Sequence, residues 1–530
     1  MQEWSGGLGA REVGPAQGGW GERALFALVV LAQLVPVWLV GTFVTQDGPA
    51  HVASAAVLRE LLDGGGGGAG RYFELAPGVV PNWAGHAILV GLSYVVTPLL
   101  GEKILVSVCV LLLPIAARYA LTGVRPGAGW VAWLVLPLVH ARPMQMGFYS
   151  FSIGLGLLLV LVGSWLRHRE RPTWGSALAL GVLAVATFVS HLFCAAVGLG
   201  FIVVMSIALG MGRGAWKAWL ALAPAAALTV AAAVGQAGQG GPATVTLARA
   251  LRDLVALDVL VSHGPAEAYW AAGVAVLLAI AAVVACRGRG GVERSDGWAA
   301  IAVGLAIACV LARDERAMLL YVPDRLAIAL VLCLALWLSA QRYRPAAQRG
   351  LIAAAALLAL VGTALQVRPR LELDGQAGRI LALAHHVPRS ATLVAVVYAP
   401  QGVGHGPASL HTAPLMHIGG YVAAVRGAVD LSNYEGWTGH FPLRFREGVN
   451  PRGAGRTCFV EPTPDRPPLA ALGRYQRETA VRVDYVLVVG AMESKPPHPF
   501  TRELAGDLAA DYEHVDGNAA ATLYRARTRE

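Results

Sequence analysis

Long apolar runs recur along the chain as far as residue 367, and they constrain its fold more than any other feature. The first covers residues 23–44, and several others also approach the roughly 20 helical residues that cross a bilayer core. Only 14% of the 530 residues are charged, whereas a soluble protein carries about a quarter. The sequence therefore predicts a polytopic α-helical membrane protein with about 11 to 13 transmembrane helices.

The basic residues predict which loops face the cytoplasm, because cytoplasmic loops collect Lys and Arg. They cluster at 118–125, 167–171, 213–217, 287–294 and 342–349. All of these loops fall on one side when the apolar run 84–100 is a re-entrant or surface-lying helix instead of a span. About eleven spans then remain, and an odd number of spans places the two ends of the chain on opposite sides of the membrane.

This topology divides the chain into three parts. Residues 1–22 form a cytoplasmic N-terminal segment, and residues 23–367 form the transmembrane domain, with a first outer loop at 45–102. Residues 52–62 of that loop are amphipathic, which predicts a helix lying along the membrane surface. Residues 368–530 are richer in prolines and charges and form an extracytoplasmic domain.

The C-terminal domain is expected to have an α/β fold. A helix is predicted at 376–386, and buried strands are predicted at 394–398, 485–489 and 522–525. Two stretches, 416–421 and 433–441, mix aromatic and hydrogen-bonding side chains, as sugar sites do and as many core turns also do. The net charge of +9 comes from short loops between apolar runs, so we expect no nucleic-acid partner.

Asp47 and His51 follow directly on the first apolar run, where they lie at a membrane surface. Ionisable residues at such positions are costly and are candidates for function. The alternative is that Asp47 only caps a helix, since Gly48-Pro49 suits the first helical positions. A cap alone does not explain His51 one turn later.

Other polar residues gather on the same outer face: His86, Arg142, His191, Arg313, Arg316 and Arg325. Each has a structural alternative. A histidine at a helix end, such as His191, is often a hydrogen-bonded cap, and residues 313–316 could be a solvated loop of paired charges.

The arrangement resembles the membrane-embedded GT-C glycosyltransferases, the superfamily of protein O-mannosyltransferases, lipid A aminoarabinose transferases and oligosaccharyltransferases. The shared features are Asp47 at the start of the first outer loop, surface helices in that loop, a Pro-led apolar segment at 81–100 and an extracytoplasmic C-terminal domain. The chain departs from the family pattern at Gly48, where many members carry a second acid.

The resemblance implies an enzyme that moves one sugar from a polyprenyl-phosphate carrier to a glycan, lipid or protein acceptor at the outer face. Lysine is rare while alanine, glycine and arginine are abundant, which favours a bacterial source, so the expected location is the bacterial cytoplasmic (inner) membrane and cell envelope. We expect membrane lipid to surround the transmembrane domain as a partner.

Sugar transfer needs a carboxylate to take the acceptor proton and cations to stabilise the departing phosphate. Asp47 is the candidate base, and His51 either orients it or contacts the acceptor. Arg325, at the start of a span, is the first candidate to bind the carrier phosphate. The remaining predicted substrate-binding residues are Arg142, Arg313, Arg316, His86 and His191. Carboxylates near the first loop are scattered, so we expect no cofactor and no metal.

Two other functions fit the same residues. A transporter or flippase for lipid-linked sugars would use the outer charges as a head-group site. A non-catalytic membrane assembly factor would use the C-terminal domain to bind a partner, with Asp47 as a helix cap. The assembly-factor hypothesis predicts that Asp47→Asn has no effect, whereas the enzyme hypothesis predicts a large loss of activity.

Overall fold

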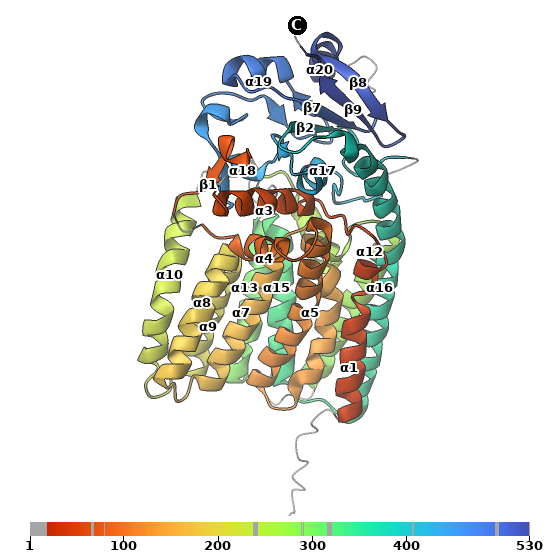
Figure 1. The fold of residues 1–530 in the computed structure, drawn as a ribbon. Coiled ribbons are helices and arrows are strands. Elements are labelled where there is room, and N and C mark those ends of the chain that lie inside the picture. The colour runs from red at the N-terminus through yellow and green to blue at the C-terminus, as the bar shows by residue number, and fades with distance from the viewer. Residues whose placement is uncertain are drawn as a thin grey trace, which may run out of the picture.

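A bundle of helices carries a smaller α/β domain at one end (Figure 1). The computed structural model describes residues 19–64, 68–78, 80–236, 242–287, 289, 291–314, 318, 321–404, 408–492 and 498–528. The first helix begins at the end of the bundle that is remote from the α/β domain. The predicted helical membrane protein with a C-terminal α/β domain is confirmed.

Within the described residues, nine helical stretches are long and apolar enough to cross a membrane. They are α1 (Trp20–Ala32) with α2 (Val35–Trp38), α5 (Pro98–Val124), α7 (Tyr149–His168), α9 (Leu192–Leu209), α10 (Trp216–Gln236), α12 (Pro265–Arg287), α13 (Gly297–Leu311), α15 (Val322–Ala340) and α16 (Pro345–Leu381). The loops that follow α5, α7, α9, α12 and α15 lie at the end remote from the α/β domain.

Two shorter apolar segments also run between the ends of the bundle. They are α8 (Trp174–Ser190), with 17 residues, and η2 (Ala128–His140), with 13 residues. η2 is a 3₁₀-helix, which rises about 2.0 Å per residue, so it reaches about 26 Å. It is buried throughout and packs against α5, α15 and α16. Nine plus two crossings of the described chain agree with the predicted count of eleven.

The first outer loop forms a layer between the bundle and the α/β domain. It contains α3 (Gly48–Leu62), η1 (Ala69–Arg71), β1 (Phe73–Leu75) and α4 (Trp83–Ser93). With 11 residues, α4 is about 16 Å long and cannot span a bilayer; it lies beneath α3 (Figure 1). The apolar run 84–100 is therefore divided between α4 and the start of α5.

The expected surface position of residues 52–62 needs correction. α3 does lie across the end of the bundle, but most of its residues are buried. It packs on α4 and α5 on one side and on α17 (Gly419–Arg426) of the C-terminal domain on the other. A helix that is covered on both sides has no face left for lipid, so α3 joins the two domains instead of anchoring the loop to the membrane.

The C-terminal domain is built on a five-stranded mixed sheet with strand order β3-β2-β7-β9-β8. Its strands are β2 (Thr392–Val397), β3 (Val429–Asp430), β7 (Tyr485–Val489), β8 (Tyr512–Gly517) and β9 (Ala521–Ala526). β2 pairs in parallel with β3 and β7, whereas β9 is antiparallel to β7 and β8. The three predicted strands match β2, β7 and β9.

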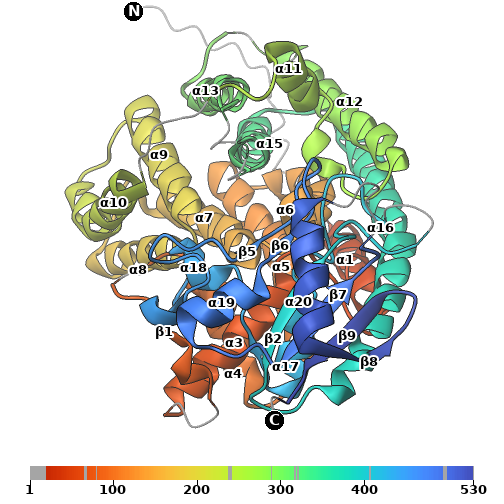
Figure 2. The ribbon, with the colours of Figure 1, turned by 90° about the horizontal axis from the view of Figure 1, so that it is seen from above.

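Further short elements complete the two domains. They are α6 (Arg142–Gln145), α11 (Leu247–Val255), η3 (Asp258–Leu260), η5 (Ala382–His386), α18 (Glu435–Thr438), β4 (Leu443–Phe445), β5 (Phe459–Val460), β6 (Leu469–Ala470), α19 (Leu472–Thr479) and α20 (Pro499–Asp511). Seen from above, the C-terminal domain covers α3, α4 and α5 and leaves α9, α10 and α13 uncovered (Figure 2).

Two connections tie the C-terminal domain to the outer loop. β1 of the loop pairs antiparallel with β4 of the domain. α16 runs without a break from the bundle into the domain, so the expected domain boundary at 367/368 falls inside this helix. The Asp374 carboxylate of α16 accepts hydrogen bonds from the backbone N–H groups of Gly41 and Thr42, at 2.9 and 2.7 Å. The segment that precedes Asp47 is therefore fixed before α3 begins.

The α3–α17 contact is close enough to require glycine. A Cβ atom at Gly420 would lie 2.3 Å from the carbonyl oxygen of Pro49. We expect Gly420→Ala to push the two helices apart and cost about 1–3 kcal/mol, measured as a lower melting temperature of the purified protein. Gly506→Ala in α20 is the control, because open space surrounds that position and alanine favours a helix. Equal melting temperatures for Gly420→Ala and the wild type would contradict this packing.

Candidate functional site

The start of α3 is held by its neighbours in the bundle. Oγ1 of Thr45 accepts a hydrogen bond from the N–H of Gly48 at 3.1 Å and lies 2.9 Å from the hydroxyl of Tyr149. The N–H of Asp47 donates to the carbonyl oxygen of Met146 at 2.9 Å. The Asp47 side chain makes no capping hydrogen bond. Thr45 therefore caps α3, a role that the sequence analysis considered for Asp47.

The Asp47 carboxylate instead faces residues of the C-terminal domain. Oδ1 lies 3.7 Å from Nε2 of His417, and the Tyr434 hydroxyl hydrogen-bonds to the carboxylate. The rings of His417 and Tyr434 stack on each other with centroids 4.4 Å apart. Nε2 of Gln46 donates to Oδ1 at 3.4 Å. Asp47 thus lies at the seam of the two domains, held by groups from both.

Burial gives this carboxylate the character of a base. Asp47 is 7% exposed, and loss of water raises its pKa, although the nearby His417 and His51 oppose the rise. A raised pKa strengthens a carboxylate as a proton acceptor.

Arg325 supplies a cation in the same neighbourhood. Its guanidinium lies over the rings of Phe148 and Phe151, 5.0 and 5.6 Å from their centroids. Its Nε is buried without a hydrogen-bond partner among the described residues, and the Asp47 carboxylate is close enough to interact with it electrostatically. A buried guanidinium with an unused donor is suited to an anionic group such as phosphate.

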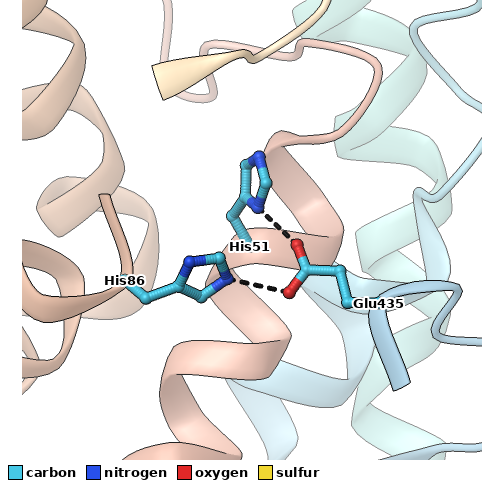
Figure 3. A group of neighbouring side chains, drawn as sticks. All are labelled: His51, His86 and Glu435. Carbon is cyan, nitrogen blue, oxygen red and sulfur yellow. Dashed lines mark hydrogen bonds and ion pairs between the residues drawn. The ribbon is translucent and has the colours of Figure 1, made fainter. Parts of the chain in front are cut away.

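His51, His86 and Glu435 form a second cluster (Figure 3). His51 and Asp47 are close enough for their charges to interact. Nδ1 of His51 is in close contact with Oε1 of Glu435, and Nε2 of His86 lies 2.8 Å from Oε2. The Glu435 carboxylate, at the start of α18, thus lies between imidazoles from α3 and α4. The ring of Phe441 borders both histidines, with centroids 5.8 and 5.7 Å away.

The carboxylate of this cluster favours its ionised form although it is buried. Burial acts to raise the pKa of Glu435, but His86 and His51 outweigh it and hold that pKa below its usual range. Burial acts to lower the pKa of His51, yet Glu435 and Asp47 raise it overall. Charges in such a place persist only when they are well paired, so this cluster joins the outer loop firmly to the C-terminal domain.

The other predicted binding residues lie in different surroundings. Arg142 bridges the Asp258 and Asp324 carboxylates and also donates to two backbone carbonyls. Arg313 lines a cavity of about 120 Å³ next to Arg142. Nδ1 of His191 accepts a hydrogen bond from the N–H of Phe193 at 3.2 Å and caps α9, which is the structural role that the sequence analysis gave as its alternative. We therefore assign Arg142 and His191 structural contacts.

Arg316 lies outside the described residues, so its predicted role stays a prediction. Several residues of the site were not among those predicted from the sequence. His417, Tyr434 and Glu435 lie in the stretches 416–421 and 433–441, whose mixed composition was noted but does not single out individual side chains. Glu102 lies at the start of α5, and its fully buried carboxylate accepts hydrogen bonds from the Tyr149 and Tyr421 hydroxyls at 2.6 and 2.5 Å. The adjacent charges Glu102-Lys103 at the edge of an apolar run were the available signal.

The capping assignment can be tested by stability. We expect Thr45→Val to lower stability by about 1 kcal/mol, because it removes the acceptor for the N–H of Gly48. Asp47→Asn should retain wild-type stability, because the carboxylate caps nothing. Melting temperatures of the purified variants measure both effects. Asp47 would regain the capping role if its substitution proved as destabilising as that of Thr45.

Comparison with known proteins identifies the fold. No protein-family model and no curated protein matches the chain. A cryo-EM structure of the arabinofuranosyltransferase AftD from Mycobacteria matches 96% of this chain and 40% of that one, with 15% identity and a TM-score of 0.51. A mutant of the same enzyme matches at 16% identity, covering 96% and 42% of the two chains, with a TM-score of 0.49. The chain thus spans about 40% of the length of AftD, and it shares the fold of the matched part of that arabinofuranosyltransferase.

Proposed function

We propose that this protein is a glycosyltransferase that moves a sugar from a polyprenyl-phosphate-linked donor to an acceptor at the outer face of the membrane. One observation carries the proposal: the buried Asp47 carboxylate, which caps no helix, lies near the guanidinium of Arg325, whose Nε has no hydrogen-bond partner among the described residues. A base and a phosphate-binding cation are the two groups that such a transfer requires.

Asp47 acts as the general base. Its carboxylate takes the proton of the acceptor hydroxyl while the hydroxyl oxygen forms a bond to the anomeric carbon of the donor sugar. The bond from that carbon to the carrier phosphate breaks, and the phosphate departs with the electron pair. The developing positive character of the sugar ring resembles that in glycoside hydrolysis, and Asp47 carries the opposite charge before it receives the proton.

Arg325 stabilises the leaving phosphate. Its planar guanidinium presents several N–H donors to phosphate oxygens, and its position at the outer end of α15 suits a carrier whose lipid tail lies in the bilayer. Surrounding aromatic rings and the buried position weaken solvent screening, which strengthens the interaction with an anion. Arg313 and Arg316 remain outside this proposal.

His417 and Tyr434 are positioning residues for the base. Both come from the C-terminal domain and contact the Asp47 carboxylate from the side opposite the bundle. Their stacked rings also provide the kind of flat aromatic surface against which sugars bind. The acceptor, whether a glycan, a lipid or a protein, therefore approaches Asp47 along the C-terminal domain.

We also propose the orientation of the chain in a bacterial cytoplasmic membrane. The loops that follow α5, α7, α9, α12 and α15 are basic and lie together at the end remote from the C-terminal domain. Because cytoplasmic loops are enriched in Lys and Arg, that end is cytoplasmic. The C-terminal domain and Asp47 then face the outside, where lipid-linked sugars are consumed.

Transfer of labelled sugar in membranes tests the proposed function. With a panel of polyprenyl-phosphate monosaccharides that includes an arabinofuranosyl donor, we expect the wild type to transfer one of them. Asp47→Asn should lower the rate by a factor on the order of 10² or more, because the base is lost while the side-chain shape is kept. Arg325→Ala should lower it by a comparable factor, because the leaving phosphate is no longer stabilised.

Arg368→Ala is the matched control, since this arginine of α16 has a 90% exposed side chain and should transfer at the wild-type rate. Equal expression of all variants is checked by immunoblot. If wild-type membranes transfer no sugar but bind or move a lipid-linked sugar, the transporter hypothesis replaces the enzyme hypothesis. Transfer that survives Asp47→Asn would remove Asp47 from the mechanism.

Reporter fusions test the orientation. A phosphatase fused after Arg171, in the loop between α7 and α8, should be inactive because that loop is cytoplasmic. The same reporter fused to the C-terminus should be active because it is exported. Phosphatase activity after Arg171 would reverse the proposed orientation, and a fluorescent protein at the same two sites provides the opposite readout.

A further inference from the structure

In both histidines of the cluster, the ring nitrogen that points away from Glu435 donates a hydrogen bond to a backbone carbonyl oxygen. Nε2 of His51 donates to the carbonyl oxygen of Gly147 at 3.0 Å, and Nδ1 of His86 donates to that of Asn82 at 3.2 Å. A carbonyl oxygen only accepts, so these two nitrogens carry the hydrogens. In neutral imidazoles, the remaining nitrogens of His51 and His86 then turn their lone pairs toward the Glu435 carboxylate.

Two lone pairs facing a carboxylate repel it unless something positive lies among them. Either two additional protons make both histidines cationic, or one divalent cation occupies the space. Both choices give the cluster the same net charge, since two protons and a divalent ion each contribute two positive charges. The positions of the atoms must therefore distinguish them.

The positions of the ligand atoms fit a metal. Nδ1 of His51 and Oε1 of Glu435 are buried and in close contact, and Nε2 of His86 faces the other carboxylate oxygen. Two imidazole nitrogens and a carboxylate gathered in one buried space are ligands that a metal ion uses. The three ligand atoms from His51, His86 and Glu435 all lie within 4.8 Å of one another.

In place of the metal-free site expected from the sequence, we propose that His51, His86 and Glu435 bind a divalent transition-metal ion, with zinc as the best fit to this donor set. Two imidazole nitrogens and one carboxylate are a common set of protein ligands for zinc. Histidines that bind a metal usually donate their other ring N–H to a carbonyl or carboxylate, as both do here. Around zinc, ligand atoms are about 3.3 Å apart, so Glu435 must move slightly away from His51 when the ion binds.

The ion would join three separate parts of the chain. His51 lies in α3, His86 in α4 and Glu435 at the start of α18, so one ion links the outer loop to the C-terminal domain. His51 follows Asp47 by one helical turn, which makes the ion a support for the position of Asp47. The proposal concerns binding alone and holds whether or not the protein transfers sugars.

Metal binding is measured on the full chain, purified in detergent and stripped with a chelator. A second, exposed group, His385, His386 and Asp516, could also hold an ion, so His386→Ala is the background for every measurement. We expect this protein to bind one equivalent of Zn²⁺ in competition with a chromophoric chelator and to melt at a higher temperature when zinc is present.

Glu435→Gln in that background should weaken zinc binding at least 100-fold, because one anionic ligand is lost while the shape is kept. Co²⁺ provides an independent readout, since its absorption spectrum reports the number and type of ligands and should change with the same substitution. Size-exclusion chromatography confirms that the variant is folded.

Zinc binding of the background protein alone already decides the proposal if Glu435→Gln fails to fold. One equivalent of zinc, with a cobalt spectrum of nitrogen and oxygen ligands, supports it. No bound zinc overturns it and leaves two protons as the occupants of the cluster. Zinc binding that a folded Glu435→Gln protein retains unchanged also overturns it, because the ion then lies elsewhere.

Discussion

A buried chain of hydrogen bonds around Glu102 fixes the start of α3, and the candidate site depends on it. The Tyr149 and Tyr421 hydroxyls donate to the two oxygens of the Glu102 carboxylate. Since the Tyr149 hydrogen is used there, its oxygen accepts from Thr45, which in turn accepts from the N–H of Gly48. The chain links α5, α7, α17 and α3. A partly satisfied network of this kind would be costly, so the two domains and the outer loop are stable only in this arrangement.

The same carboxylate leaves no room for a side chain directly after Asp47. A Cβ atom at Gly48 would lie 2.1 Å from Oε1 of Glu102, so no side chain fits there. The space in which a second acid of the loop would begin is thus filled by a carboxylate that arrives from α5. Glu102 is tied to two tyrosines, so Asp47 is the carboxylate that faces the C-terminal domain.

Patterns local in sequence predicted most of the fold, and contacts between distant residues limited the rest. Apolar length and basic loops were enough for the crossings, including the one at residues 129–140, although a 3₁₀-helix there follows from packing and not from sequence. The amphipathic pattern of residues 52–62 correctly predicted a helix across the end of the bundle, but it could not show that α17 covers this helix. Asp47 could be proposed from the sequence because its position at the end of the first apolar run is unusual. Glu435 was missed because its histidine partners lie more than 300 residues away, and a lone glutamate in a loop carries no signal of them.

The contacts of Asp47 imply that the site is complete only when the C-terminal domain is docked. The bundle positions the backbone through Met146 and the Thr45 cap, while His417 and Tyr434 hold the carboxylate from above. Neither set is sufficient, since the first leaves the side chain free to rotate and the second depends on where α3 begins. Because α16 is continuous between the domains and also fixes the segment before Asp47, a shift of the C-terminal domain would move both sets at once. The C-terminal domain is therefore part of the site itself.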